Sequence, residues 1–199
     1  MDYTLAIENA PDEIPGGTGV LLLHPSIGET DRIDTDFLKT DTDHFLVIST
    51  RTTAREVKQK LDHYGVIAED GSDGPESAVI LDTLSIERGY SRRSTDDVFY
   101  AASPDDLDSI LEITEQFLTD HDGKLRLSVD SITEMIYYSD EDRVFEAMEK
   151  LLALLEEHDA VGLFHLSEGV HDDEDVERFK RLFDGVVYLD DEERVSAEF

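Results

Sequence analysis

Residues 14–38 read IPGGTGVLLLHPSIGETDRIDTDFL and hold the side chains of this chain best suited to a charged ligand. In this stretch an apolar run leads into a polar turn, and a helix-like segment follows. Backbone N–H groups of such a turn can cradle phosphate, and hydroxyl or carboxylate oxygens can hold Mg²⁺. The turn, called here the 24–31 turn, consists of His24, Pro25, Ser26, Ile27, Gly28, Glu29, Thr30 and Asp31.

Two further apolar runs end in polar residues that could join this chemistry. The run LRLSVD ends at Asp130 and is followed by Ser131, while Arg51 and Thr52 come shortly after the run FLVIS. An Asp at the carboxyl end of a parallel strand usually serves a ligand or Mg²⁺. Two interpretations of Asp130 stay open: it serves a ligand, or it holds structure by bonding to the 24–31 turn.

These residues need a scaffold, and the hydrophobic pattern predicts one. The short apolar runs are 19–24, 45–49, 78–82, 98–101, 125–130, 161–166 and 185–189. Most are continuous rather than alternating, which is typical of strands buried on both faces of a mostly parallel sheet. Helix-period segments lie between them, so the pattern predicts βαβ units. We expect an α/β protein, a three-layer α/β/α sandwich, with residues 1–199 as one domain.

The helix ends and one edge strand can also be placed. The pattern predicts helices over 53–64, 140–158 and 176–183. A further helix is expected from Ser103, as N-cap with Pro104 at the first helical position, to about His121. The weak alternation of residues 194–199 predicts an edge strand.

In this order the chain resembles the KaiC-like branch of the RecA superfamily of P-loop ATPases, whose first strand and loop read IPxGxxxLLxGPxGxGKTTLALQFL. The matching residues are Ile14, Pro15, Gly17, Leu22, Leu23, Pro25, Phe37 and Leu38. The phosphate-binding positions depart from the pattern. His24 and Glu29 stand for loop glycines, and Thr30 stands for the lysine. Asp31 stands for the Mg²⁺-binding hydroxyl, and a shift by one residue puts Glu29 on the lysine instead.

The resemblance extends downstream over nearly the whole chain. It places Asp130 and Ser131 on the Walker B strand, and Arg51 and Thr52 where the family has its catalytic Glu. A carboxylate about 4 Å from a phosphate charge costs on the order of 4 kcal/mol at an effective dielectric near 20. We therefore expect an acidic hollow, no catalytic residues and no nucleotide cofactor. Mg-ATP held by Asp31 and Asp130 remains the alternative.

The overall charge restricts the partners and the environment. The chain has 49 acidic and 17 basic residues, with a net charge of −32 spread over its length. Repulsion between so many like charges destabilises the compact state at low salt and is screened at high salt. We therefore expect the salt-rich cytoplasm of a halophilic archaeon. An acidic protein of a mesophile is the alternative. Direct nucleic-acid binding needs clustered basic residues, and the one cluster, Arg88, Arg92 and Arg93, reads as a solvated loop. No apolar run approaches membrane-spanning length.

A second group of potential ligands follows the run 161–166. His165, Glu168, His171 and Asp172 are suitable metal ligands, but His165 lies in an apolar run and the acids after His171 suit a helix start. We expect no metal there.

The resemblance implies a non-catalytic regulatory or signalling protein that acts through protein contacts, with copies of itself or an active KaiC-like relative. The alternatives are an ATPase-like signalling protein with an atypical Mg-ATP site, and an accessory protein of a DNA-associated ATPase.

Overall fold

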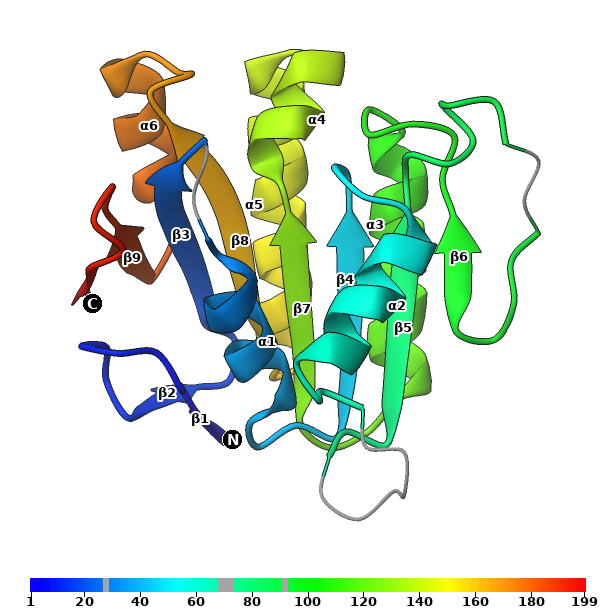
Figure 1. Cartoon of the computed structure of the whole chain (residues 1–199), viewed down its shortest axis with the longest axis horizontal. Helices are drawn as coiled ribbons and strands as arrows, with labels where there is room; N and C mark the ends of the chain where they lie inside the picture. The colour runs from blue at the N-terminus through cyan, green and yellow to red at the C-terminus, as the bar shows by residue number, and fades with distance from the viewer. Residues whose placement is uncertain (27–28, 68–73, 91–92) are drawn as a thin grey trace.

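A mostly parallel sheet runs through the centre of the molecule (Figure 1). The computed structural model describes residues 1–26, 29–67, 74–90 and 93–199, so Ile27, Gly28 and Arg92 lie outside the described residues. The elements are β1 (Asp2–Thr4), β2 (Glu13–Pro15), β3 (Gly19–Pro25), α1 (Asp31–Lys39), β4 (His44–Ser49), α2 (Ala54–His63), β5 (Ser77–Asp82), β6 (Val98–Tyr100), α3 (Leu107–Asp120), β7 (Leu125–Asp130), α4 (Ile132–Tyr138), α5 (Glu141–Glu157), β8 (Val161–Glu168), α6 (Asp173–Lys180), β9 (Gly185–Leu189) and β10 (Val195–Glu198).

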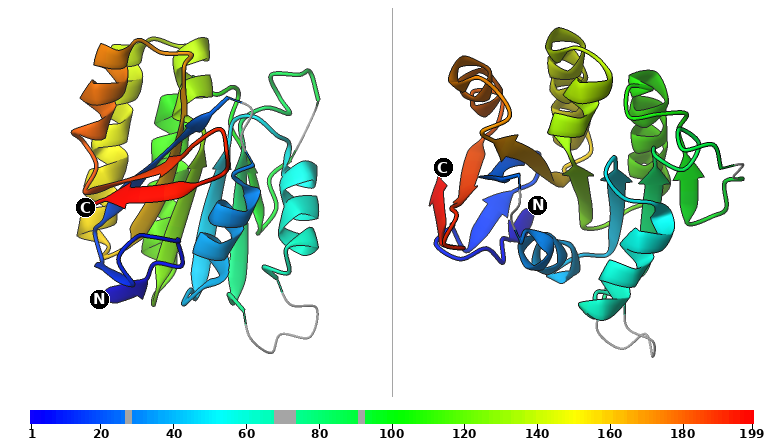
Figure 2. Two further views of the ribbon diagram at one scale, coloured as in Figure 1. Left: turned by 60° about the vertical axis from the view of Figure 1, so that its left-hand side comes forward. Right: turned by 45° about the horizontal axis from the view of Figure 1, so that its top comes forward.

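The strand order of the central sheet is β10-β9-β3-β8-β7-β4-β5-β6. Every pair in it is parallel except β9 with β10. Strand β10 lies at one end of this order, as expected for the predicted edge strand. Helices α1 and α2 cover one face, and α3, α5 and α6 cover the other (Figure 2). The prediction of a three-layer α/β sandwich with a mostly parallel sheet is confirmed.

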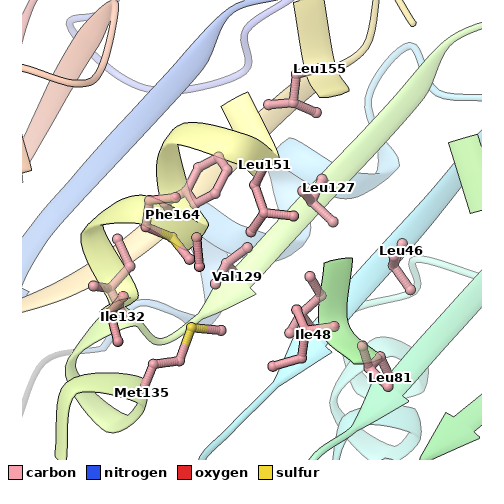
Figure 3. Packing of buried hydrophobic residues seen from close by; sticks show 14 of the residues in the cluster. Leu46, Ile48, Leu81, Leu127, Val129, Ile132, Met135, Leu151, Leu155 and Phe164 are labelled. Atoms are coloured by element: carbon pink, nitrogen blue, oxygen red, sulfur yellow. The ribbon is translucent and has the colours of Figure 1, made fainter. Parts of the chain in front are cut away.

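The continuous apolar runs are explained by two cores, one on each face of the sheet. Along β3, Leu21 and Leu23 belong to the core beneath α3, α4 and α5, while Val20 and Leu22 belong to the core beneath α1 and α2. Successive side chains of a strand point to opposite faces, so the four positions Val20–Leu23 at the centre of β3 are all apolar. Figure 3 shows the first core, where Phe164 lies beside residues of β7 and α5.

One helix start was predicted wrongly, and one short helix was not predicted. Helix α3 begins at Leu107 rather than next to Pro104, because the Asp106 carboxylate accepts the Ser109 N–H and caps the helix there. The Ser103 hydroxyl instead bonds the Asp105 side chain. Helix α4 has only 7 residues, too few for a hydrophobic period to stand out.

No helix within the described part of the chain combines the length and the apolar character needed to cross a membrane.

Candidate functional site

The carboxyl ends of β3, β4, β7 and β8 lie together at one edge of the sheet (Figure 1). His24 is near the end of β3, Asp130 is the last residue of β7, and Arg51 follows β4 by two residues. The register pairs Ser49 with Asp130 across β4 and β7. The topology therefore brings most of the polar residues singled out in the sequence to a single region.

A buried ion pair between α1 and α2 lies below this edge. Asp34 has 0% of its surface exposed, and its Oδ2 accepts a hydrogen bond of 2.9 Å from Lys60 Nζ. Its Oδ1 accepts 2.5 Å from Ser128 Oγ and lies 3.1 Å from His165 Nε2. Burial by itself would raise the pKa of Asp34, but Lys60, His165 and Ser128 outweigh it and hold that pKa far below its ordinary value. Asp34 is therefore ionised and fully partnered.

A second ion pair joins the residue after β4 to the end of β7. Arg51 Nη2 donates 3.0 Å to Asp130 Oδ2, and Arg51 Nε lies 2.8 Å from Asp130 Oδ1 as a close ionic contact. Burial acts to raise the pKa of Asp130, but the charges of His165 and Arg51 lower it overall. Among the described residues the Asp130 carboxylate bonds Arg51, while Ile27 and Gly28 of the 24–31 turn lie outside them, so both interpretations of Asp130 stay predictions.

Two histidines lie against these pairs. The rings of His24 and His165 meet edge to face with centroids 5.7 Å apart, and His24 Nδ1 is 2.8 Å from the Pro25 carbonyl oxygen. Within the described part of the chain, His24 Nε2 and His165 Nδ1 are buried without a hydrogen-bond partner. Burial lowers the pKa of His24, because it penalises the charged imidazolium. Acid and base chemistry would thus start from a neutral His24.

The other predicted site residues have simpler surroundings. Ser26 and Glu29 are exposed, and Thr30 is buried just before α1. Asp31 begins α1, with its carboxylate 3.8 Å from Lys60. Ser131 caps α4, donates its N–H to Thr50 Oγ1 at 2.6 Å, and is buried. Thr52 accepts a 2.7 Å hydrogen bond at its carbonyl from the Ser49 hydroxyl and so serves the turn after β4.

The residues of the possible metal group go to different partners. His165 contacts Asp34, while His171 Nε2 lies 2.9 Å from the Thr133 hydroxyl. Glu168 and Asp172 are exposed. Among the residues that the structure describes, no group of three or more His, Cys, Asp or Glu side chains has the arrangement of a metal site.

The region of the expected acidic hollow also contains positive charge that the sequence pattern did not indicate. Two cations enter the region from outside the 24–31 turn: Lys60 from α2 and Arg51 from the β4–α2 connection. Each is bound to one buried or partly buried carboxylate, so the charges cancel in pairs. We refer to Asp34, Lys60, Arg51, Asp130 and His165 as the ion-pair network.

Comparison with solved structures supports the fold. A KaiC-like protein from the hyperthermophilic archaeon Pyrococcus horikoshii has a TM-score of 0.61 and 16% identity, covering 92% of this chain and 77% of that one. An ATPase of the type III secretion system of pathogenic bacteria has a TM-score of 0.60 and 12% identity, covering 90% and 53%. The chain thus spans about half of that ATPase. At these identities the likeness establishes a RecA-like core and nothing finer.

No curated protein matches the sequence. The profile of one protein family, described as "Family of unknown function (DUF7090)", matches residues 1–199. This match includes every element of the sheet and every residue of the ion-pair network. The chain has the α/β fold of the KaiC-like protein, and it belongs to the DUF7090 family.

Proposed function

We propose that this protein is a non-catalytic regulatory or signalling protein on a RecA/KaiC-like core, and that it acts through protein–protein contacts. The observation that carries the proposal is the ion-pair network. Lys60 and Arg51 are two cations in the region of the candidate site, and each already binds a carboxylate of the chain itself, Asp34 and Asp130. The site is thereby closed to an external anion by internal charges.

The energetic argument rests on the burial of these groups. Recruiting Lys60 to a phosphate would leave Asp34, with 0% exposure, without its cation. Removing one partner of a buried ion pair costs about 3–5 kcal/mol. Mg²⁺ at Asp130 would in turn have to displace the Arg51 guanidinium. Hydrolysis also requires a group that activates water, and Arg51 and Thr52 occupy the positions aligned with the catalytic Glu.

The alternative is a nucleotide-binding signalling protein with an atypical Mg-ATP site, and one observation favours it. Lys60 lies 3.8 Å from Asp31, at the start of α1, so a cation stands near the end of the 24–31 turn despite the missing loop lysine. Lys60 could bind a triphosphate if another group balanced the negative charge of Asp34. His165 is the example, because it already contacts Asp34.

Calorimetric titration of Mg-ATP separates the two proposals. We expect no saturable heat, because Lys60 and Arg51 stay bound to Asp34 and Asp130. The titration is done at about 0.2 M and about 2 M KCl, because salt screens both repulsion and attraction between the nucleotide and the charges of the chain. The Asp130→Asn variant is the matched control, since it removes the carboxylate that would hold Mg²⁺. Sub-millimolar binding by the natural chain that disappears in this variant would instead establish the Mg-ATP site.

We further propose a salt-rich cytoplasm, with copies of this chain or an active KaiC-like relative as partners. The support is the net charge of −32, which disfavours the compact state at low salt and disfavours contact with nucleic acid. The thermal unfolding midpoint should therefore rise when KCl is increased from about 0.2 M to about 2 M, where the Debye length shortens to about 3 Å or less. A midpoint that stays constant or falls would contradict the salt adaptation, and sedimentation of the same samples would show self-association.

A further inference from the structure

A cavity of about 670 Å³ lies on the β5–β6 side of α2, apart from the ion-pair network. Its walls come from the first two turns of α2, the end of β5 with the turn that follows, and β6. Its volume is in the range that holds small organic ligands. It also lies at the carboxyl ends of parallel strands, where open α/β sheets bind ligands.

The floor of the cavity is fixed by a single buried carboxylate. Asp82 Oδ2 accepts the Ala54 N–H at 2.7 Å and the Ser85 hydroxyl at 2.6 Å. Asp82 Oδ1 accepts the N–H groups of Leu84 and Ser85, both at 2.8 Å. These four hydrogen bonds occupy the acceptor sites of the carboxylate and tie the start of α2 to the turn after β5. The cavity is thus preformed, and its buried acid is already satisfied by N–H and O–H donors.

Two arginines on the cavity wall set its charge. Arg55 in α2 and Arg88 after β5 are exposed, and within the described residues neither forms a hydrogen bond or ion pair through its side chain. Most other lysines and arginines in the described part of the chain, such as Lys58 and Lys124, form an ion pair with a carboxylate. In a chain with 49 acidic and 17 basic residues, these two guanidinium groups share the cavity with one exposed carboxylate, Glu56, whose pKa is lowered first by its hydrogen bonds to Thr53 and then by the charge of Arg88.

The remaining wall residues limit the competing charge and add ring surface. Glu56 is held in the helix cap, where its Oε2 accepts the Thr53 N–H at 2.7 Å and the Thr53 hydroxyl at 2.8 Å. Tyr100 in β6 and Tyr90 after β5 line the same cavity. Guanidinium groups bind carboxylate or phosphate with paired hydrogen bonds, and aromatic rings pack on planar groups.

We propose that this cavity binds a small organic anion with a planar ring, its acid group on Arg55 and Arg88 and its ring against Tyr100. The acid group is a carboxylate or a phosphate, because either matches the guanidinium fork. The proposal is independent of the proposed function, since no residue of the ion-pair network lines the cavity.

Titrations followed by amide NMR of the ¹⁵N-labelled chain test the proposal with phenyl phosphate, phenylacetate, benzyl alcohol and inorganic phosphate as probes. At least one of the two ring acids should shift the amide signals of Ser85 and Arg88 saturably. Its dissociation constant should weaken about tenfold or more in the Arg55→Gln/Arg88→Gln variant, which loses two charged hydrogen-bond donors. The preferred ring acid identifies the acid group.

Arg181→Gln is the matched control, because Arg181 is also exposed but lies after α6, away from the cavity. This variant should bind as the natural chain does. Three results would overturn the proposal: no saturable shift with any probe up to about 10 mM, equal binding by the double variant, or benzyl alcohol or inorganic phosphate binding as tightly as the ring acids. A thermal unfolding scan of each variant confirms that the chains compared are folded.

Discussion

Replacing Lys60 with methionine is expected to lower the free energy of unfolding by about 3–5 kcal/mol, the typical cost of removing one partner from a buried ion pair. The reason is that Asp34, with 0% exposure, would keep its negative charge in the interior without the ammonium 2.9 Å away. Methionine preserves most of the volume and flexibility of the lysine stem, so lost packing contributes little. Urea unfolding at pH 8 measures the change, since imidazoles are ordinarily neutral there, about 1.5 units above their usual pKa.

Two further variants show whether the loss is electrostatic. In the Asp34→Asn/Lys60→Met variant both charges are gone, while the asparagine oxygen can still accept from Ser128. This double variant should recover most of the stability that Lys60→Met loses. Lys58→Met is the matched control on the same helix, because Lys58 and Asp97 have 49% and 55% exposed side chains. Its effect should stay below about 1 kcal/mol.

The result that would contradict this account is a Lys60→Met variant as stable as the natural chain, with the double variant no better. The Asp34 charge would then be carried by other groups, and the closure of the site by Lys60 would lose its support. Equal losses in Lys58→Met and Lys60→Met would point to a general effect of removing positive charge from a very acidic chain.

Acid should remove the contribution of Asp34 to stability. Its pKa is lowered in the folded chain, so the contribution is complete above the unfolded value of about 3.9 and is lost as the pH falls toward the folded pKa. One salt-bridged carboxylate of this kind contributes on the order of 2–3 kcal/mol. Protonation of surface acids acts in the opposite direction, because it relieves the repulsion of a chain with charge −32.

Comparison with a matched variant separates these effects. The difference in unfolding free energy between the natural chain and Asp34→Asn/Lys60→Met should be constant between about pH 5 and pH 8 and shift against the natural chain toward pH 2. Relief of surface repulsion is common to both chains and cancels. The Asp97→Asn/Lys58→Met pair should show a much smaller shift, since both side chains are half exposed. Parallel curves for all three chains would mean that Asp34 does not titrate as an ion pair.

Most strands could be predicted from the sequence because they are short, mostly apolar runs buried on both faces, although β7 also buries Arg126 and Ser128. The runs 125–130 and 185–189 match β7 and β9, whose ends are set by the same burial that makes them apolar. The start of α3 could not be placed, since Ser103 and Asp106 are both good caps and only the folded chain shows that Asp106 is used. Local pattern cannot rank two capping residues three positions apart.

The residues of the candidate site divide in the same way. Asp130 could be recognised because it ends a buried strand, and His24 because it is a polar residue near the end of one. Asp34 and Lys60 could not, since in sequence each is one charged residue among many on an amphipathic helix. Their pairing depends on how α1 and α2 pack side by side on the sheet, 26 positions apart in the chain. One signal in the sequence could have indicated Lys60: it lies in a short helix that contains two lysines, in a chain with only 17 basic residues.

The contact between Lys60 and Asp34 also has a mechanical consequence. It links α1 to α2, and the contact between Arg51 and Asp130 links the β4–α2 connection to β7. A displacement of α1 must therefore carry α2 with it or separate charges in the protein interior. Under the proposed function, a protein partner that binds this face would therefore contact α1 and α2 in one fixed relative position.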